Sequence, residues 1–269
     1  MAAAKLRRFV LLCVLGLFIL FLYGPTLTIL VLSFQGPDGG LTFPLNGVSL
    51  HWFHRLFETQ AVGDFGGSLT RSFLLATMVM AATVVVSLAA GMAFRRRFRG
   101  SGALFALTVA SLIIPSILVS LGVGLLFNAL GFDPDWYSSA FGAQLTWTLP
   151  FGLLIMFAVF NRFNRSWEEA ARDQGATPWQ SFRHVVLPII APSVIGIALF
   201  GFTLSYDEFA RTLLTAGSDN TLPLEIFGMT TSVTTPVLYA LGTLTTLFSF
   251  VVILVSLLIV RLLAAKRAT

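Results

Sequence analysis

The sequence contains little charge, a single cysteine and only two lysines. Charged residues make up 11% of the 269 residues, whereas roughly a quarter of the residues in a soluble domain are charged. One cysteine, Cys13, cannot form a disulfide framework or a cysteine cluster for a metal ion. Neither Lys5 nor Lys266 ends a glycine-rich loop, so no such loop is present to hold a nucleotide phosphate. These absences exclude a disulfide-rich secreted domain and an ATPase.

Hydrophobic residues dominate what is present. They make up 56% of the sequence, 26 residues are phenylalanine, and the mean hydropathy is +0.87. The net charge of +5 could indicate a nucleic-acid-binding protein, but the basic residues stand in short clusters at the ends of apolar runs. Clusters in these positions orient a membrane protein. We therefore expect a protein embedded in the lipid bilayer, with no nucleic acid among its partners.

Six apolar runs are each long enough to cross about 30 Å of hydrocarbon as a helix. The first run follows a basic cluster and lacks the short apolar core and cleavage site of a signal peptide. Breaks are expected at Pro115, Pro150 and Pro192, where neighbouring helices can satisfy the freed carbonyl groups. The predicted spans are residues 9–33, 68–94, 103–130, 143–160, 189–210 and 238–263. The sequence thus predicts an all-α polytopic membrane protein with one transmembrane domain over residues 1–269.

The basic residues predict the orientation of these spans. If the N-terminus is cytoplasmic, 14 of the 17 basic residues lie on the cytoplasmic side, as positive-inside bias requires. The 14 are Lys5, Arg7, Arg8, Arg95, Arg96, Arg97, Arg99, Arg162, Arg165, Arg172, Arg183, Arg261, Lys266 and Arg267, and the outer three are Arg55, Arg71 and Arg211. We expect both termini and the loop 161–188 to be cytoplasmic, and the loop 35–67 to be periplasmic.

One stretch of the outer loop has the pattern of an interfacial amphipathic helix. Residues 50–57 read LHWFHRLF, with aromatic and apolar residues on one side. His51 and His54 stand three residues apart, but no third metal ligand is near them in the sequence. No metal site is expected.

The cytoplasmic loop carries the signals for two short helices. Ser166 and Glu169 have the spacing of a capping box, and Gly175 suits the left-handed residue that ends a helix. Thr177 and Gln180 form a second box, with a proline at the first helical position. Pro188 closes the stretch. The pattern predicts a small helix, a tight turn and another small helix.

This loop resembles the EAA loop of inner-membrane permease subunits of binding-protein-dependent ABC importers. The resemblance rests on an EAA triplet, a glycine four positions after it and a final V-x-L-P, with valine where the family prefers isoleucine. It implies a coupling helix that docks into a groove of a separate ATPase, formed by Glu169, Ala170, Ala171, Gly175, Val185, Leu187 and Pro188. The alternative is an ordinary amphipathic helix pair that binds nothing.

The resemblance also implies the fold, the partners and the location. The fold is that of a type I ABC importer permease with six spans. The partners are a second permease subunit, paralogous to this one, two ATP-binding subunits and a periplasmic or lipid-anchored binding protein. ATP and magnesium bind to the ATPase, so this chain is a non-catalytic subunit of the bacterial inner membrane without a cofactor. We expect the loop to transmit ATPase closure to the fifth and sixth spans as a rigid-body shift.

Further motifs resemble the spermidine/putrescine permeases within that family. They are NGVSLHWF with RLF at 46–57, FRRRFRG at 94–100, LSYDEF at 204–209 and LPL at 222–224. The resemblance implies a small cationic cargo. Because relatives that carry other solutes share these motifs, an amino acid derivative such as GABA, an opine, a phosphonate, thiamine or ferric ion stays an alternative.

A polycation path needs carboxylates or aromatic faces to replace water. Asp207 and Glu208 are the candidate carboxylates, although an ion pair between Asp207 and Arg211 at the end of a helix would explain them equally well. Tyr206, Phe202 and Trp147 could form an aromatic wall, with lipid or core packing as the alternative.

A secondary transporter or a membrane enzyme is the alternative from another class. It would require charged residues near the middle of the membrane or a catalytic constellation. The sequence contains neither HExxH nor Gly-x-Ser-x-Gly, and we find no such cluster in the predicted spans.

Overall fold

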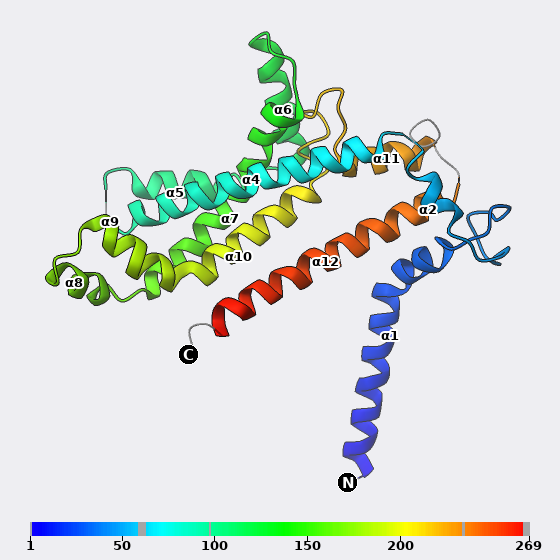
Figure 1. Ribbon diagram of the computed structural model, residues 1–269, viewed down its shortest axis with the longest axis horizontal. Helices are drawn as coiled ribbons and strands as arrows, with labels where there is room; N and C mark the ends of the chain where they lie inside the picture. The colour runs from blue at the N-terminus through cyan, green and yellow to red at the C-terminus, as the bar shows by residue number, and fades with distance from the viewer. Residues whose placement is uncertain (1, 59–62, 97, 233–234, 266–269) are drawn as a thin grey trace. The chain divides into compact units, whose positions relative to one another are not determined.

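A computed structural model describes residues 2–58, 63–96, 98–232 and 235–265, and in these residues all the regular elements are helical (Figure 1). The only extended pairing among them is an isolated bridge between Gln35 and Val48. The elements are α1 (Ala2–Leu32), α2 (His51–Arg55), α4 (Phe65–Phe94), α5 (Ser101–Ala110), α6 (Ser116–Ala129), η1 (Trp136–Ala140), α7 (Phe141–Arg162), α8 (Ser166–Asp173), α9 (Pro178–Ser181), η2 (Phe182–Val186), α10 (Leu187–Tyr206), α11 (Leu222–Ser232) and α12 (Val237–Ala265). The predicted all-α class is confirmed.

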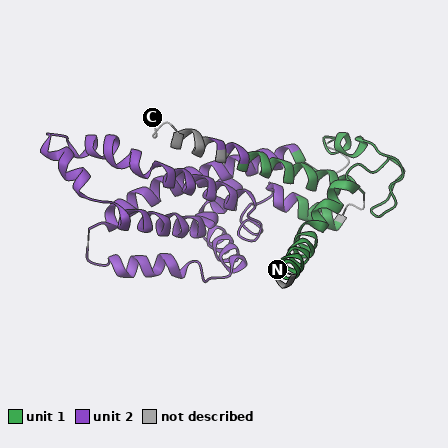
Figure 2. Ribbon diagram, turned by 90° about the horizontal axis from the view of Figure 1, so that it is seen from below, with its two compact units in different colours: residues 1–65, 226–253 green, residues 66–225, 254–269 purple. Residues whose placement is uncertain are grey.

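The chain divides into two compact units (Figure 2). The first comprises residues 1–65 and 226–253, and the second comprises residues 66–225 and 254–269. The second unit contains the loop 161–188, predicted to be cytoplasmic, and the candidate pathway residues, and the first contains α1 and most of the loop 35–67, predicted to be periplasmic.

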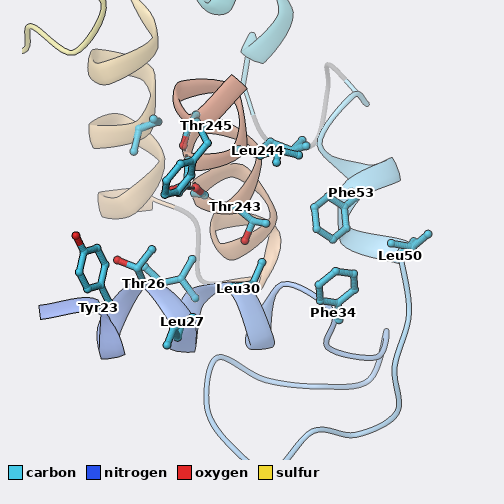
Figure 3. Close-up of a pocket in the computed structure, with 16 residues that line it drawn as sticks. Tyr23, Thr26, Leu27, Leu30, Phe34, Leu50, Phe53, Thr243, Leu244 and Thr245 are labelled. Atoms are coloured by element: carbon cyan, nitrogen blue, oxygen red, sulfur yellow. Dashed lines mark hydrogen bonds between the residues drawn. The ribbon is translucent and has the colours of Figure 1, made fainter. Parts of the chain in front are cut away.

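In the first unit, α1 is apolar on every face from Phe9 onward, and its side chains from Phe9 to Leu22 are exposed. A helix that is apolar all round needs lipid or protein around it, and a span of this length suits lipid. An apolar cavity of about 760 Å³ lies between α1, α2 and α12, lined for example by Leu30, Phe53 and Phe250. Figure 3 shows Leu30 and Phe53 among the side chains around it. The threonine hydroxyls at 245 and 246 donate to backbone carbonyls of α12, so they add little polarity to it.

A buried glutamine organises the outer loop of the first unit. The Gln35 amide donates to the carbonyl oxygens of Gly40, Thr42 and Pro44, and its Oε1 accepts from Asn46 N at 2.7 Å. The helix expected at 50–57 is present but shorter: α2 has five residues. Its Trp52 and Leu56 sides are buried, so the amphipathic pattern was correct.

Five stretches of the described residues are long and apolar enough to cross a membrane: Lys5–Leu32, Phe65–Phe94, Trp136–Arg162, Pro178–Tyr206 and Val237–Val255. The stretch expected as one span at 103–130 consists of two helices, α5 and α6, because the chain turns at residues 111–115. Pro115 lacks the N–H that a continuous helix would use, and it precedes the second helix. By contrast, Pro150 and Pro192 lie inside α7 and α10. The count of six spans and the side of each terminus stay predictions, and Arg97, Lys266 and Arg267 lie outside the described residues.

The core of the second unit lies where α4, α7 and α10 meet. Met156 and Phe160 of α7 pack with Ile190 and Ile197 of α10, and Val84, Leu88 and Met92 of α4 cover this cluster. Gly152 of α7 faces α4 so closely that a Cβ there would collide with the Ser87 hydroxyl and come within 3.0 Å of Thr83 Cγ2. The small residue permits the close contact of the two helices.

We predict that Gly152→Ala destabilises the second unit by about 1–3 kcal/mol, because the added methyl overpacks the contact between α4 and α7. Thermal unfolding of the purified subunit in detergent measures the change. Gly142→Ala on the same helix is the matched control, since nothing lies within 4 Å of its Cβ position. Equal unfolding temperatures for the two variants would contradict the role of Gly152.

Candidate functional site

The loop between α7 and α10 forms two short helices joined by a tight turn. Gly175 adopts the left-handed conformation, with φ of 85°, immediately after α8. Thr177 N donates to Gln180 Oε1 at 2.8 Å, and Gln180 N donates to Thr177 Oγ1 at 3.3 Å, which completes the capping box of α9. The predicted helix stop and the second box are confirmed.

The predicted capping box of Ser166 and Glu169 is wrong. Ser166 is already helical, and its backbone N–H donates to Asn164 Oδ1 at 3.0 Å. Because the asparagine side chain satisfies this N–H from two residues earlier, the helix begins without a hydroxyl cap. The sequence analysis did not find Asn164, because its side chain binds a backbone N–H two residues later in a local turn and does not have the spacing of a capping box.

The residues of the EAA pattern differ in exposure. Glu169, Ala170 and Gly175 are exposed, and Ala171 is half-buried. At the end of the pattern, Val185 lies in η2 and is half-buried, while Leu187, half-buried, and Pro188, exposed, begin α10. Val186 between them is fully buried. The first part of the pattern therefore forms a surface, and the last part anchors the loop to the core.

An ion pair that the sequence analysis did not find fixes α8. Arg95, one residue after α4, donates from Nη1 to Glu168 Oε1 at 2.7 Å and from Nη2 to Glu168 Oε2 at 2.9 Å. The two side chains are only 11% and 12% exposed. The hydrogen bonds from Arg95 hold the pKa of Glu168 below its usual value, so this carboxyl group is ionised at neutral pH. The two residues are 73 positions apart, so no local pattern could reveal the contact.

Two aromatic side chains of the loop are exposed beside these helices. Trp179 is 65% exposed and stacks on Phe182, with ring centroids 5.6 Å apart. Trp167 is 48% exposed and meets the ring of Phe163 edge to face. Aromatic residues are enriched where one protein binds another, so this surface can bind a partner.

The candidate carboxylates lie at the opposite end of α10, about 30 Å from its start at a rise of 1.5 Å per residue. The helix ends at Tyr206, so the span predicted to continue to residue 210 stops four residues earlier. Asp207 caps this end and is exposed, whereas Glu208 is only 8% exposed. The two neighbouring carboxylates therefore face different surroundings.

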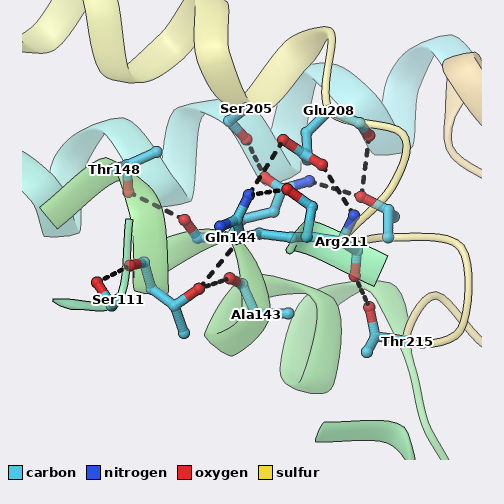
Figure 4. Close-up of polar contacts among 11 residues, drawn as sticks. Ser111, Ala143, Gln144, Thr148, Ser205, Glu208, Arg211 and Thr215 are labelled. Carbon is cyan, nitrogen blue, oxygen red and sulfur yellow. Dashed lines mark hydrogen bonds and ion pairs between the residues drawn. The ribbon is translucent and has the colours of Figure 1, made fainter. Parts of the chain in front are cut away.

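The suggested ion pair between Asp207 and Arg211 is wrong, because Arg211 turns to Glu208 instead (Figure 4). Arg211 N donates to Glu208 Oε1 at 2.8 Å, and Nη1 lies 4.0 Å from Oε2. Beyond Tyr206 the backbone leaves the helix, so residues four apart no longer share a face.

Arg211 is 1% exposed and is the largest fully buried side chain of the described residues. Its guanidinium donates to Thr146 Oγ1 at 3.2 Å and to Ser116 Oγ at 2.6 Å, and it lies over the Trp147 ring at 4.9 Å. The segment after α10 is thereby held against α6 and α7 by one buried cation, and Glu208 compensates its charge.

Gln144 of α7 connects this segment to α10 (Figure 4). Ser205 Oγ donates to Gln144 Oε1, and Gln144 Nε2 donates to Thr212 Oγ1 at 2.9 Å. Thr148, one turn along α7, donates to the Gln144 carbonyl and accepts from Thr83 of α4 at 2.9 Å. Ser205 and Gln144 stand within predicted spans, where polar side chains commonly form hydrogen bonds between helices, and the structure shows that they do so.

The predicted aromatic wall is divided in two. Phe202 and Tyr206 stack with ring centroids 5.9 Å apart and an angle of 10°, and both are buried. Trp147 instead lies against Phe151 and the Arg211 guanidinium. Since Phe202 also meets the Phe73 ring of α4, the structure favours core packing for this pair.

No group of three or more His, Cys, Asp or Glu side chains that could hold a metal ion occurs in the part of the chain that the structure describes.

The unequal burial of the two carboxylates yields a prediction about stability. Glu208→Gln keeps the hydrogen bond to Arg211 N but leaves the buried guanidinium without its counter-charge, which should cost about 3 kcal/mol. Asp207→Asn should change stability by less than about 0.5 kcal/mol, because its side chain is exposed. Thermal unfolding of the two purified variants tests this, and equal losses would contradict the assignment.

Comparison with known sequences identifies relatives over most of the chain. The family model described as binding-protein-dependent transport system inner membrane component matches residues 83–269. The spermidine/putrescine transport system permease protein PotC of Haemophilus influenzae is 31% identical over 243 residues, which cover 90% of this chain and 92% of that protein. The putrescine transport system permease protein PotI of Escherichia coli K12 is 32% identical over 232 residues, covering 83% and 81%.

Solved structures share the fold. A bacterial ABC transporter chain involved in the import of the acidic polysaccharide alginate matches with a TM-score of 0.70 at 17% identity, covering 100% of this chain and 99% of that one. A chain of the MetNI methionine ABC transporter matches with a TM-score of 0.57 at 18% identity, covering 73% and 94%. Their identity is too low to carry over a cargo, so they show the fold alone.

The predicted ABC importer permease is thus confirmed by a family match over residues 83–269, by relatives named as permease subunits and by neighbours with the same fold. The chain belongs to the family of binding-protein-dependent transport system inner membrane components, and it is a multi-pass, non-catalytic permease subunit of the bacterial inner membrane.

Proposed function

We propose that this permease subunit forms half of the path by which an ATP-driven importer takes up a polyamine such as spermidine or putrescine. The observation that carries the proposal is the identity of 31% to a spermidine/putrescine permease over 90% of this chain. A second permease subunit completes the path, two ATP-binding subunits drive it, and an external binding protein delivers the cargo. This chain itself binds no cofactor, and ATP and magnesium bind to the ATPase.

The exposed surface around Glu169, Ala170 and Gly175 is the proposed docking site for the ATPase. Small side chains let another protein approach the helix backbone, and Trp179 offers a large apolar contact beside them. Glu168, which precedes the triplet, is already paired with Arg95. Of these two adjacent glutamates, Glu169 is therefore the one whose carboxylate remains on the surface.

The charges near the other end of α10 favour a cationic cargo. Anionic cargoes would require an arginine in the path, and the candidates are Arg71 and Arg211, because Arg55 lies in the predicted outer loop and pairs with Glu58. Arg211 is buried among hydroxyl groups and an indole ring, and Arg71 Nε donates to the carbonyl of Asn220 at 2.7 Å. The exposed carboxylate of Asp207 can replace part of the hydration of an ammonium group.

The fold does not select the cargo, since an importer of an acidic polysaccharide has a similar fold. Uptake of labelled spermidine by the reconstituted complex therefore tests the proposal. We predict that Asp207→Asn lowers this uptake by about tenfold, the loss of one charged contact worth about 1.4 kcal/mol. Complexes with Glu169→Gln serve as the reference for weakened coupling to the ATPase, and protein-free vesicles serve as the reference for leakage of spermidine across the membrane.

Saturable spermidine uptake that ATP drives would support the proposal. The opposing result is a complex that takes up neither spermidine nor putrescine and instead imports an amino acid derivative, opine, phosphonate, thiamine or ferric ion when ATP is supplied. That result would show that this other solute, and not a polyamine, is the cargo. Normal uptake by the Asp207→Asn complex would remove this carboxylate from the path.

Gly175 provides a separate test of the coupling surface. Gly175→Val places a β-branched residue at a φ of 85°, which should cost roughly 1–3 kcal/mol of local strain and displace the turn after α8. We expect complexes that assemble and hydrolyse ATP but import little. Gly131→Val is the matched control, because its φ is 79° and its Cβ position is also open. Wild-type uptake by the Gly175→Val complex would show that the turn does not couple.

A further inference from the structure

The coupling loop contacts three long helices, but the chain connects it directly to only two. Residues 163–165 join α8 to α7, and α9 and η2 join it to α10. The third helix, α4, is about 70 residues away in sequence and reaches α8 only in space. Because α8 has eight residues, it is too short to be stable alone and depends on such contacts.

The contact between α4 and α8 centres on one guanidinium. Besides its two hydrogen bonds to Glu168, Arg95 lies 5.0 Å from the centre of the Phe160 ring and 5.3 Å from that of Phe163. The planar cation is thus enclosed by aromatic faces from the end of α7 and by a carboxylate from α8. A bidentate pair in such surroundings fixes direction as well as distance.

A third hydrogen bond joins the same two segments, with the donor now on the α8 side. Arg165 Nη2, just before α8, donates to the backbone carbonyl of Arg95 at 2.7 Å. The side chain of Arg95 therefore holds α8, while a side chain from the start of α8 holds the backbone at the end of α4. Movement of α8 away from α4 would have to break both contacts.

At its other end, α4 holds the segment that follows the candidate carboxylates. Ser72 Oγ accepts from Leu222 N at 2.7 Å, and Arg71 Nε donates to the Asn220 carbonyl at 2.7 Å. Between the two ends, Thr83 of α4 binds Thr148 in the buried network around Gln144. One continuous helix thus contacts the coupling loop at its C-terminal end and the segment after Asp207 near its N-terminal end.

We infer that Arg95 and Glu168 are positioning residues that link α4 directly to the coupling helix α8, so that ATPase closure moves α4 together with α7 and α10. The inference rests on the proposed coupling function. It differs from the expected route through the fifth and sixth spans, because the second span receives the motion through an ion pair. A rigid pair of this kind suits a switch between two discrete packings.

The test uses the reconstituted complex with Arg95→Gln, Glu168→Gln and the double variant. Each single change leaves an opposite charge without its partner at the site, and we expect it to lower spermidine taken up per ATP hydrolysed by about tenfold. The double variant should be no worse than either single variant, because it leaves no unpaired charge. ATP hydrolysis should continue in all three, which a misfolded subunit would not permit.

Matched controls separate this role from general effects of charge removal. Glu58→Gln breaks the ion pair of Glu58 with Arg55, whose contact of 2.8 Å is similarly short, but the side chains of that pair are 46% and 56% exposed, so the uptake ratio should stay at the wild-type value. Hydrogen exchange of the α8 amides in lipid nanodiscs gives a readout that needs no cargo, and Glu168→Gln should accelerate it.

The outcomes distinguish the inference from the function on which it rests. If the wild-type complex imports no polyamine, the proposed cargo fails, and faster α8 exchange in Glu168→Gln alone still supports the link to α4. Wild-type uptake per ATP in both single variants, with unchanged α8 exchange, would overturn the inference. So would a double variant whose loss equals the product of the two single losses, because independent residues behave in that way.

Discussion

The structure depends on the rule that a polar group inside a membrane must find its partner within the protein. Helices satisfy their own backbones, and threonine hydroxyls such as those of Thr203 and Thr245 donate back to carbonyls of their own helix. Where the chain leaves the helix, as it does after Tyr206, side chains have to supply the bonds. Gln144, Arg211 and their hydroxyl partners do so, and they therefore hold the non-helical segment in one arrangement.

The same rule separates the polar residues into those that fix the fold and those that can act on a partner. Glu168 and Glu208 each compensate an arginine, and both are largely buried. Their neighbours are exposed: Glu169 on α8 and Asp207 at the end of α10. In each pair of adjacent carboxylates, Glu168 with Glu169 and Asp207 with Glu208, the two residues thus have different roles. One stabilises the structure, and the other faces the ATPase or the cargo in the proposed function.

Sequence reasoning succeeded where the determining forces are local. Gly175 and the box at Thr177 depend on residues within four positions, and the all-α class depends on the length of apolar runs. It failed where distant residues compete for a partner. Arg211 turned to Glu208 because the helix ended at Tyr206, and Arg95 found Glu168 across 73 positions. The substrate path and the coupling role remain predictions, because each requires partners outside this chain.

The polar contacts of α4 also explain how one helix can link two distant sites of the second unit. A helix is stiff along its axis because each turn is hydrogen-bonded to the next, so a displacement at one end of α4 is carried to the other. Such a displacement reaches the neighbouring segments only if both ends of the helix are held by contacts that specify direction. Arg95 holds one end through a bidentate carboxylate, and Ser72 with Arg71 holds the other through backbone groups. A purely apolar contact at either end could slide, since the hydrophobic effect is not directional. Fixed polar contacts at the ends and apolar packing along the middle are therefore the arrangement that a moving permease helix requires.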